Sequence, residues 1–290
     1  ATELAEHFGA PQSYGSYEEL LSSEEIDAVY IPSPTSSHVK WSTKAAQMGK
    51  HVLCEKPLAL NASEIDNLIE IEKKNQVFIS EAFMVAYHPQ WHRVKELIKD
   101  GSIGALRHVQ GAFTYFNNDP NNMRNQLRLG GGGLPDIGVY PIVTTRLTTL
   151  EEPHSVAASI KYDKDFKTDV FASAQVHFNN FDLSFYCSTQ MALRQHMTFH
   201  GETGKIEVHA PFNARVYGHA RVTLHSQDNL IIQEFKFGDT NQYKLQIEEF
   251  SLAIKTGLRD SIFDLTSSKN NQKVIDAIYA ADKSGQIVKV

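Results

Sequence analysis

The chain has 290 residues, of which 41% are hydrophobic and 21% charged, as is typical of a soluble globular protein with one large or two ordinary domains. Its net charge of -6 argues against nucleic acid or an anionic membrane as the main partner, because an acidic surface attracts neither. No uncharged apolar stretch approaches the length of a membrane span, and the first residues lack the basic and apolar regions of a signal peptide.

Cysteine and histidine usage predicts a cytoplasmic protein without a metal site. Cys54 and Cys187 are the only cysteines, and such sparse usage favours free thiols in a reducing compartment, although two thiols could form one disulfide. The 13 histidines are scattered. Only His88 and His92 have a metal-like spacing, and the same spacing fits the start of a surface helix.

The first third of the chain alternates between helical and strand-like patterns. Leu4 and Phe8 fit a short helix that ends at Gly9, and Ser16 with Glu19 forms a capping box that opens a second helix. The later elements are expected as strand 27–32, helix 37–48, strand 51–54, helix 63–75 and strand 77–80. Short apolar strands separated by such helices predict a parallel sheet covered on both faces.

From residue 88 onward the pattern changes to one helix followed by many alternating strands. The expected elements are helix 90–99, strands 108–115, 155–162, 170–178, 182–188, 196–200 and 221–225, and helices 241–256 and 266–284. Alternation of apolar and polar residues indicates a mostly antiparallel sheet with one covered face. The chain is therefore expected to be an α/β protein with a parallel-sheet domain over residues 1–87 and an α+β domain over residues 88–290.

Two short motifs look suited to chemistry. One is the stretch 49–57, an apolar strand that ends in Glu55-Lys56-Pro57, and the other is the stretch 130–141, a glycine run followed by Asp136 and Tyr140. If the segment from residue 135 is helical, Asp136 and Tyr140 lie on one face, because positions i and i+4 are neighbours on a helix. A lysine at a strand end and a phenol on a helix can meet in one cleft.

One expected feature is missing from the parallel-sheet half. A nucleotide-binding sheet opens on a strand that runs into a G-x-G-x-x-G turn, whereas this chain opens on a helix. The glycines at 130–133 lie in the wrong half to replace that turn. We therefore expect an upstream strand-helix-strand unit of about thirty residues in the complete protein.

Three motifs in order carry a family resemblance. The stretch 49–57, the segment from Glu81 to Met84 with the Tyr87-His88-Pro89-Gln90 that follows, and the glycine-rich stretch 131–141 together resemble the Gfo/Idh/MocA oxidoreductases. Tyrosine at position 140, where inositol-dehydrogenase-like members carry histidine, is similar to the branch of glucose-fructose oxidoreductase, xylose dehydrogenase and dimeric dihydrodiol dehydrogenase. The resemblance covers the whole chain.

The resemblance implies an N-terminal Rossmann-type domain, a C-terminal domain with a large open sheet, and NAD or NADP as cofactor. It further implies a sugar or polyol substrate, such as a pyranose, an aldose or a trans-dihydrodiol, and a homodimer or higher homo-oligomer formed by the open sheet. The missing first strands remove the residues that distinguish NAD from NADP. Ala86 stands where related sequences carry arginine, which puts one polar contact in doubt.

By the same resemblance, Lys56 and Tyr140 are the catalytic residues. Oxidation of a hydroxyl needs a base for the proton and an acceptor for the hydride, and nicotinamide supplies the acceptor. A free tyrosine has a pKa of about 10, and a nearby ammonium such as that of Lys56 favours the phenolate. The alternatives are a solvated lysine at a strand end and a half-buried packing tyrosine. Asp136 is expected either to bind substrate hydroxyls or to act as a first-turn helix acid.

The remaining candidates lie at strand ends, where parallel sheets bind ligands. They are assigned to the cofactor, with Lys56 included: Pro32, Ser33, Thr35, His38, Glu55 and Glu81. A simple Pro-Ser turn with a helix cap is the alternative for residues 32–38. Arg124 is a candidate for substrate binding or is merely solvated, and the resemblance suggests a cis bond between Lys56 and Pro57.

A second class of function stays open at this stage. The intact Lys56 and Tyr140 favour an NAD(P)-dependent enzyme, whereas the missing glycine turn favours a catalytically silent paralogue. Such a paralogue would bind a sugar or nucleotide and serve as a regulator or assembly partner.

Overall fold

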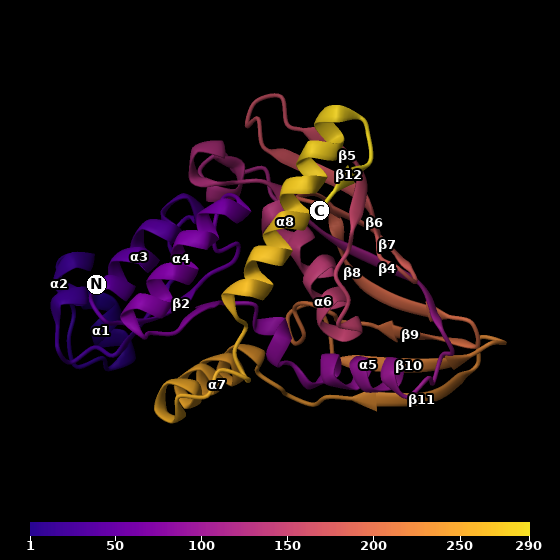
Figure 1. The fold of residues 1–290 in the computed structure, drawn as a ribbon, viewed down its shortest axis with the longest axis horizontal. Helices are drawn as coiled ribbons and strands as arrows, with labels where there is room; N and C mark the ends of the chain where they lie inside the picture. Colours follow the sequence, from indigo (N-terminus) through magenta and orange to yellow (C-terminus); the bar gives the residue numbers. More distant parts are fainter.

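The computed structural model describes all residues from 1 to 290 and divides them between two sheets (Figure 1). The N-terminal part alternates helices and strands as expected. Its elements are α1 (Thr2–Phe8), α2 (Tyr17–Ser22), β1 (Ala28–Ile31), α3 (His38–Gln47), β2 (His51–Cys54), α4 (Ala62–Asn75) and β3 (Ile79–Glu81). The strands form a parallel sheet in the order β1-β2-β3.

Local sequence explains these boundaries. Ser16 caps α2 by accepting a hydrogen bond from the Glu19 amide, as the predicted capping box requires, while the Glu19 side chain accepts one from the Gly15 amide. Asn61 caps α4 in the same way through the Glu64 amide. Buried side chains on one face of α4 and along β2 then pack into a shared core, and the elements are fixed against each other.

The second part contains a sheet of nine strands and four α-helices. Its helices are α5 (Pro89–Lys99), α6 (Val139–Thr149), α7 (Gln242–Thr256) and α8 (Leu265–Ser284), together with a π-helical turn at Leu134–Gly138. Its strands are β4 (Leu106–Phe116), β5 (Ser155–Tyr162), β6 (Asp169–His177), β7 (Asp182–Ser188), β8 (Gln190–Gly201), β9 (Gly204–Val208), β10 (Arg221–Ser226), β11 (Ile231–Lys236) and β12 (Val288–Lys289).

The strand order is β11-β10-β9-β8-β4-β7-β6-β5-β12, and only β4 and β7 pair in parallel. The prediction of a mostly antiparallel sheet is confirmed. The sequence pattern missed β9, β11 and β12 and made β8 too short. The strand β12 has only two residues, and β11 is an edge strand whose residues are almost all exposed, so neither shows the alternation on which the prediction relied. The strand β9 does alternate, but it has only five residues and was overlooked.

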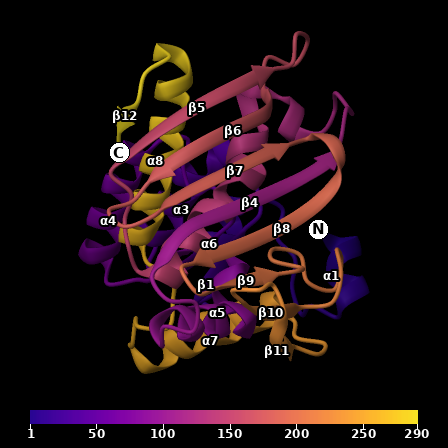
Figure 2. The same cartoon turned by 90° about the vertical axis from the view of Figure 1, so that its right-hand side faces the viewer.

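One face of the large sheet is covered by helices, and the other is open. Figure 2 shows the strands toward the viewer with α5, α6 and α8 behind them. The small apolar residues of β6, Ala172, Ala174 and Val176, point to the covered face and join the main core. The outward residues of β6 include Phe171, Ser173 and Gln175.

The last two helices contact both parts of the molecule. The helix α8 runs between the two sheets in Figure 1, and its Leu265 belongs to the core around the parallel sheet. Phe250 of α7 packs with Leu53 and Phe78 from the parallel-sheet part. Because residues far beyond 87 complete the first core, the division of the chain at residue 87 stays a prediction.

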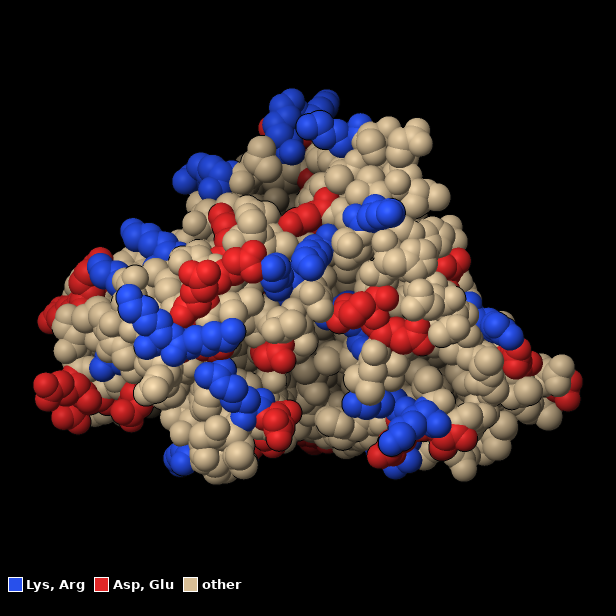
Figure 3. Space-filling view, viewed as in Figure 1, with Lys and Arg blue, Asp and Glu red and all other residues tan.

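The surface seen in Figure 3 mixes lysines and arginines with acidic residues, so this face carries no extended patch of one sign. None of the helices combines the length and the apolar character that crossing a membrane requires.

Gly201 provides a test of the packing between β8 and the segment before β4. A Cβ atom at this position would overlap the carbonyl oxygen of Ile103, so one of the two backbones would have to shift. Gly201→Ala should lower the free energy of unfolding by about 1–3 kcal/mol in urea titrations. Gly238→Ala is the matched control, because no atom lies within 4 Å of its added Cβ. Equal effects of the two changes would contradict this close approach.

Candidate active site

A cleft of about 600 Å³ opens at the carboxyl ends of β1 and β2 and is closed on its other side by the larger sheet. Ligand sites in proteins have volumes of this order. Nine of the ten predicted site residues line it: Pro32, Ser33, Thr35, His38, Glu55, Lys56, Arg124, Asp136 and Tyr140. Glu81 does not. The structure thus brings the two motifs, which are far apart in sequence, to one place.

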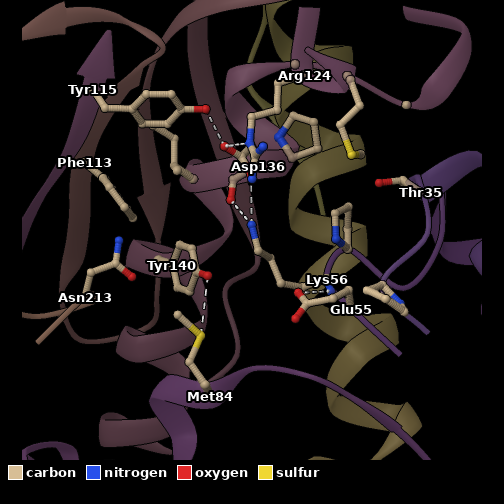
Figure 4. Close-up of a pocket in the computed structure, with 18 of the residues that line it drawn as sticks. Thr35, Glu55, Lys56, Met84, Phe113, Tyr115, Arg124, Asp136, Tyr140 and Asn213 are labelled. Atoms are coloured by element: carbon tan, nitrogen blue, oxygen red, sulfur yellow. Dashed lines mark hydrogen bonds and ion pairs between the residues drawn. The ribbon is translucent and has the colours of Figure 1, made fainter. Parts of the chain in front are cut away.

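Asp136 is the centre of the polar contacts in this cleft (Figure 4). Its Oδ1 accepts a hydrogen bond from the Lys56 ammonium at 3.0 Å, and its Oδ2 accepts one from the Tyr115 hydroxyl at 2.6 Å and one from Arg124 Nε at 2.8 Å. Burial acts to raise the pKa of Asp136, but the Lys56 ammonium and the Arg124 guanidinium outweigh it and hold this pKa at about 2. The carboxylate is therefore ionised and both of its oxygens are engaged by protein donors.

The segment that carries Asp136 is a π-helical turn followed by α6, and not the continuous α-helix that the i, i+4 argument assumed. Asp169 holds the start of this turn. Its Oδ2 accepts a hydrogen bond from the Leu134 amide, and its Oδ1 accepts one from the Tyr279 hydroxyl at 2.6 Å. Asp136 and Tyr140 still line the same cleft. The ion pairs of Asp136 with Lys56 and Arg124 were not predicted, since the sequence suggested only a hydroxyl ligand or a first-turn helix acid.

The glycine run is explained by close packing. A Cβ at Gly131 would overlap the backbone carbonyl groups of Met123 and Arg124, and a Cβ at Gly132 would overlap the Asp169 carboxylate. Gly132 also has a φ of 146°, which side-chain-bearing residues rarely adopt. These glycines let the chain pass close to the segment of Arg124 and so bring Arg124 and Asp136 together.

Tyr140 lies at the floor of the cleft and is almost fully buried among aromatic rings, including Phe113 and Phe212. Its hydroxyl has one weak partner, the Met84 sulfur at 3.5 Å. The Lys56 ammonium lies over the ring, 5.0 Å from its centre, while it binds Asp136. Burial raises the pKa of the Tyr140 phenol, and the nearby Glu55 adds to this effect. The structure thus differs from the expectation of a lowered phenol pKa, because the ammonium is committed to Asp136 and the ring is desolvated.

The turn that carries Lys56 is held by two buried side chains. The Lys56–Pro57 bond is cis, as the resemblance suggested. The ring of His38, 1% exposed, lies between two carbonyl oxygens: Nδ1 is 2.8 Å from that of Pro57 and Nε2 is 2.6 Å from that of Ser33. Burial lowers the pKa of His38, and its two carbonyl partners oppose this shift. His38 therefore joins the turn after β1 to the turn after β2.

Glu81 lies beneath this turn and is 3% exposed. Its Oε1 accepts the Leu58 amide at 2.8 Å, so it supports the backbone just beyond Lys56 and Pro57. The predicted direct contact with a cofactor is not open to it from this position. Glu55 does line the cleft, where its carboxylate accepts hydrogen bonds from the Tyr30 hydroxyl and from the Lys56 amide.

The N-terminal wall of the cleft fits the nicotinamide end of a dinucleotide. Pro32 and Pro57 offer apolar surface for a flat ring, while the Ser33 and Thr35 hydroxyls and the Glu55 carboxylate suit ribose hydroxyls and a carboxamide. Both cysteines are buried and free. The structure has no group of three or more histidine, cysteine or acidic side chains that could hold a metal ion, and His88 caps α5 through the Gln90 amide.

Several lining residues were not predicted. Tyr115 is the last residue of the predicted strand 108–115, and Asn117 lies two residues beyond it. Polar side chains at a strand end could have marked both as candidate site residues. Six further missed residues come from β8, the loop after β9 and the start of α7: Leu193, Gln195, Asn213, Val216, Tyr217 and Tyr243. No motif marks these positions in the sequence.

Comparison with known proteins agrees with this geometry. The family described as an oxidoreductase family with an NAD-binding Rossmann fold matches residues 1–83, and the GFO/IDH/MocA C-terminal domain matches residues 91–207. An uncharacterised oxidoreductase of Rhizobium meliloti is 39% identical over 289 residues, which are 98% of this chain and 86% of that protein. The NADP(+)-dependent D-xylose 1-dehydrogenase 2 of Haloferax volcanii is 31% identical over all of this chain and 88% of its own.

Among solved structures, a 3-ketoreductase from Actinomadura kijaniata in complex with NADP and TDP-benzene superposes with a TM-score of 0.89. It is 27% identical, and the match covers 97% of this chain and 86% of that one. Fold and site together define an oxidoreductase that uses NAD or NADP. The chain belongs to the Gfo/Idh/MocA family, which confirms the resemblance, the fold class and the enzyme class predicted from the sequence.

Glu81 should make stability depend on pH in a defined direction. Burial raises its pKa from the ordinary 4.5 to about 7. The folded protein therefore keeps this proton up to about pH 7, whereas the unfolded chain loses it near 4.5. The contribution of Glu81 to stability is thus complete below pH 4.5 and is lost as the pH rises toward 7.

Glu81→Gln keeps an oxygen for the Leu58 amide and does not titrate. Relative to wild type, the variant should gain on the order of 2–3 kcal/mol of unfolding free energy between pH 5 and pH 8, since one pKa unit corresponds to about 1.4 kcal/mol. Urea titrations at both pH values measure the difference, with the exposed Glu6→Gln as control. A difference that does not change with pH would rule out this titration.

Proposed function

We propose that this protein transfers hydride between NAD(P) and a sugar or polyol, with Tyr140 exchanging the proton and Lys56 supplying a positive charge beside it. The observation that carries this proposal is the position of the Lys56 ammonium, 5.0 Å from the centre of the Tyr140 ring in a cleft at the carboxyl ends of β1 and β2. Bound nicotinamide supplies or accepts the hydride.

The raised pKa keeps the Tyr140 phenol protonated near neutral pH, which is the state required of an acid when a carbonyl is reduced. Its weak bond to the Met84 sulfur leaves the proton available for a substrate oxygen. In the opposite direction the phenolic oxygen accepts the hydroxyl proton, and the charge that develops is stabilised by the Lys56 ammonium.

Asp136 sets the direction in which Lys56 acts. An ammonium has three N–H donors, and two of them go to the Asp136 backbone carbonyl and side-chain oxygen. One donor is left for a substrate oxygen or for the phenolic oxygen of Tyr140. Because Lys56 and Asp136 are both almost completely buried, their ion pair is weakly screened and holds the ammonium in place.

Relatives support both the substrate class and the two residues. One is a D-xylose 1-dehydrogenase. The 3-ketoreductase of Actinomadura kijaniata has been solved as a variant with one tyrosine changed to phenylalanine and as variants with one lysine changed to alanine or glutamate. In the sequence of that protein, the changed lysine and the changed tyrosine are separated by the same number of residues as Lys56 and Tyr140 are here. A catalytically silent paralogue is disfavoured, since both residues are present and lie in one cleft.

The proposal extends to a homodimer or higher homo-oligomer through the open face of the large sheet (Figure 2). Its centre is a patch on three adjacent strands without a charged residue. Register pairs Gln110 and Gln175 with Ser184, and Ser173 with Tyr186. Depletion of charge is typical of the centre of a protein interface, and a second copy of the chain offers a surface of the same kind.

Tyr140→Phe should lower turnover about a hundredfold or more in the full-length protein, because it removes proton transfer and little else. Steady-state oxidation of D-xylose and D-glucose with NAD or NADP measures turnover, and fluorescence titration with NADPH or NADH measures cofactor affinity, which should be nearly unchanged. Tyr17→Phe, on the exposed surface of α2, is the control. Equal loss of turnover and cofactor binding would indicate a structural tyrosine.

Sedimentation velocity at micromolar concentration should show the wild-type protein as a dimer or larger species. Tyr186→Arg places a charge at the centre of the patch and should give monomers with a retained thermal transition, since an unpaired charge at an interface is costly. Gln233→Arg on the exposed edge strand β11 is the control and should leave the assembly intact. A monomeric wild-type protein would refute this arrangement.

A further inference from the structure

Arg124 has unused hydrogen-bonding capacity in the cleft. Its Nε is bound to Asp136, whereas its two Nη groups have no partner in the cleft and no hydrogen bond in the protein. The side chain is 41% exposed, and Figure 4 shows it beside Asp136 on the side away from Glu55. A guanidinium anchored through Nε presents its remaining donors as a planar fork, which matches the two oxygens of an oxyanion.

The wall of the cleft around Asp136 has an excess of positive charge. The single carboxylate of Asp136 serves two cations, Lys56 and Arg124. Glu55 is the other acid that lines the cleft, but its carboxylate bonds to Tyr30 and lies on the N-terminal wall. Lys56, Arg124 and Asp136 together therefore carry a net positive charge at the place where the Nη groups are free. A ligand with a negative group would supply it.

The position of Arg124 relative to Tyr140 suits a single sugar. Three consecutive contacts of 5.0, 3.0 and 2.8 Å lead from the Tyr140 ring through Lys56 and Asp136 to Arg124 Nε. Tyr140 and Arg124 line the same cleft of about 600 Å³ with Asp136 between them (Figure 4), and a cleft of this volume is large enough to hold a sugar. A substrate whose reacting carbon faces Tyr140 can thus place a substituent at Arg124.

We propose that Arg124 selects sugars that carry an oxyanion, a carboxylate or a phosphate, at the end opposite to the reacting carbon. This inference rests on the proposed sugar oxidoreductase function and gives its substrate class. A charge-assisted, bidentate contact of this type discriminates on the order of 10- to 100-fold against a neutral analogue. If Arg124 served only to hold Asp136, its loss would affect acidic and neutral sugars equally.

The test compares pairs of sugars that differ only in the acidic group. D-Glucuronate and D-glucose form one pair, D-galacturonate and D-galactose a second, and D-glucose 6-phosphate distinguishes phosphate from carboxylate. Turnover is followed with NAD and NADP for wild type, Arg124→Gln and Arg124→Lys, and binding of the same sugars is measured by calorimetry. Arg128→Gln is the matched control, because this nearby arginine does not line the cleft and donates to Gln126.

In wild type, an acidic sugar should be preferred over its neutral partner by about tenfold or more in kcat/KM and in affinity. Arg124→Gln should bring this ratio close to one, mainly through KM, Arg124→Lys should give an intermediate ratio, and Arg128→Gln should leave it unchanged. No preference for any acidic sugar in wild type, or a ratio unaffected by Arg124→Gln, would overturn the inference.

The outcome also separates this inference from the proposed function. If neutral sugars are turned over equally well and Tyr140→Phe abolishes turnover, the oxidoreductase function stands and the selection by Arg124 is wrong. If acidic sugars bind through Arg124 but no sugar is turned over, the binding inference stands and the proposed chemistry is wrong.

Discussion

The ionised carboxylate of Asp136 is the constraint on which the site depends. It is almost completely buried, and such a charge is tolerated only with partners that compensate its lost hydration. Lys56 reaches it from the turn after β2, and Arg124 and Tyr115 reach it from the larger half. The ion pair between Lys56 and Asp136 thus joins the two halves of the molecule. The same contact holds the two walls of the cleft together and fixes the position of the ammonium.

The backbone around Asp136 is built to make this pair possible. The π-helical turn is held at its start by Asp169, and the glycines at 131 and 132 allow it to lie against the segment of Arg124. A side chain at either glycine would overlap backbone or carboxylate atoms. On the opposite side, His38 and Glu81 fix the peptide groups beside Lys56. Each partner of the ion pair is therefore positioned by close packing and buried hydrogen bonds of the surrounding backbone.

Much of this could be predicted from sequence because the decisive features are local. The strand His51–Cys54 has the predicted bounds, and the helices around it follow from capping and periodicity. The meeting of Lys56 and Tyr140 in one cleft was predicted from the family resemblance of the motifs that carry them. The π-helical turn could not be predicted, since its cause is tertiary: Asp169 is 35 residues from its partner Leu134. The position of Glu81 was missed for a similar reason, because a strand-end acid can point to the cleft or to the core, and sequence does not distinguish the two.

The same contacts explain why Lys56 and Tyr140, the two residues proposed to be catalytic, are kept in different electrostatic environments. A lysine free to approach the phenolic oxygen would favour the phenolate and so remove the proton that carbonyl reduction needs. Asp136 draws the ammonium over the ring face, where it remains close enough to stabilise developing charge but leaves Tyr140 protonated. When a substrate oxygen enters between them, it can accept both the phenolic proton and the remaining ammonium donor. In the proposed reaction, the ammonium therefore stabilises the transition state more than the resting state, because negative charge develops next to it only during the hydride transfer.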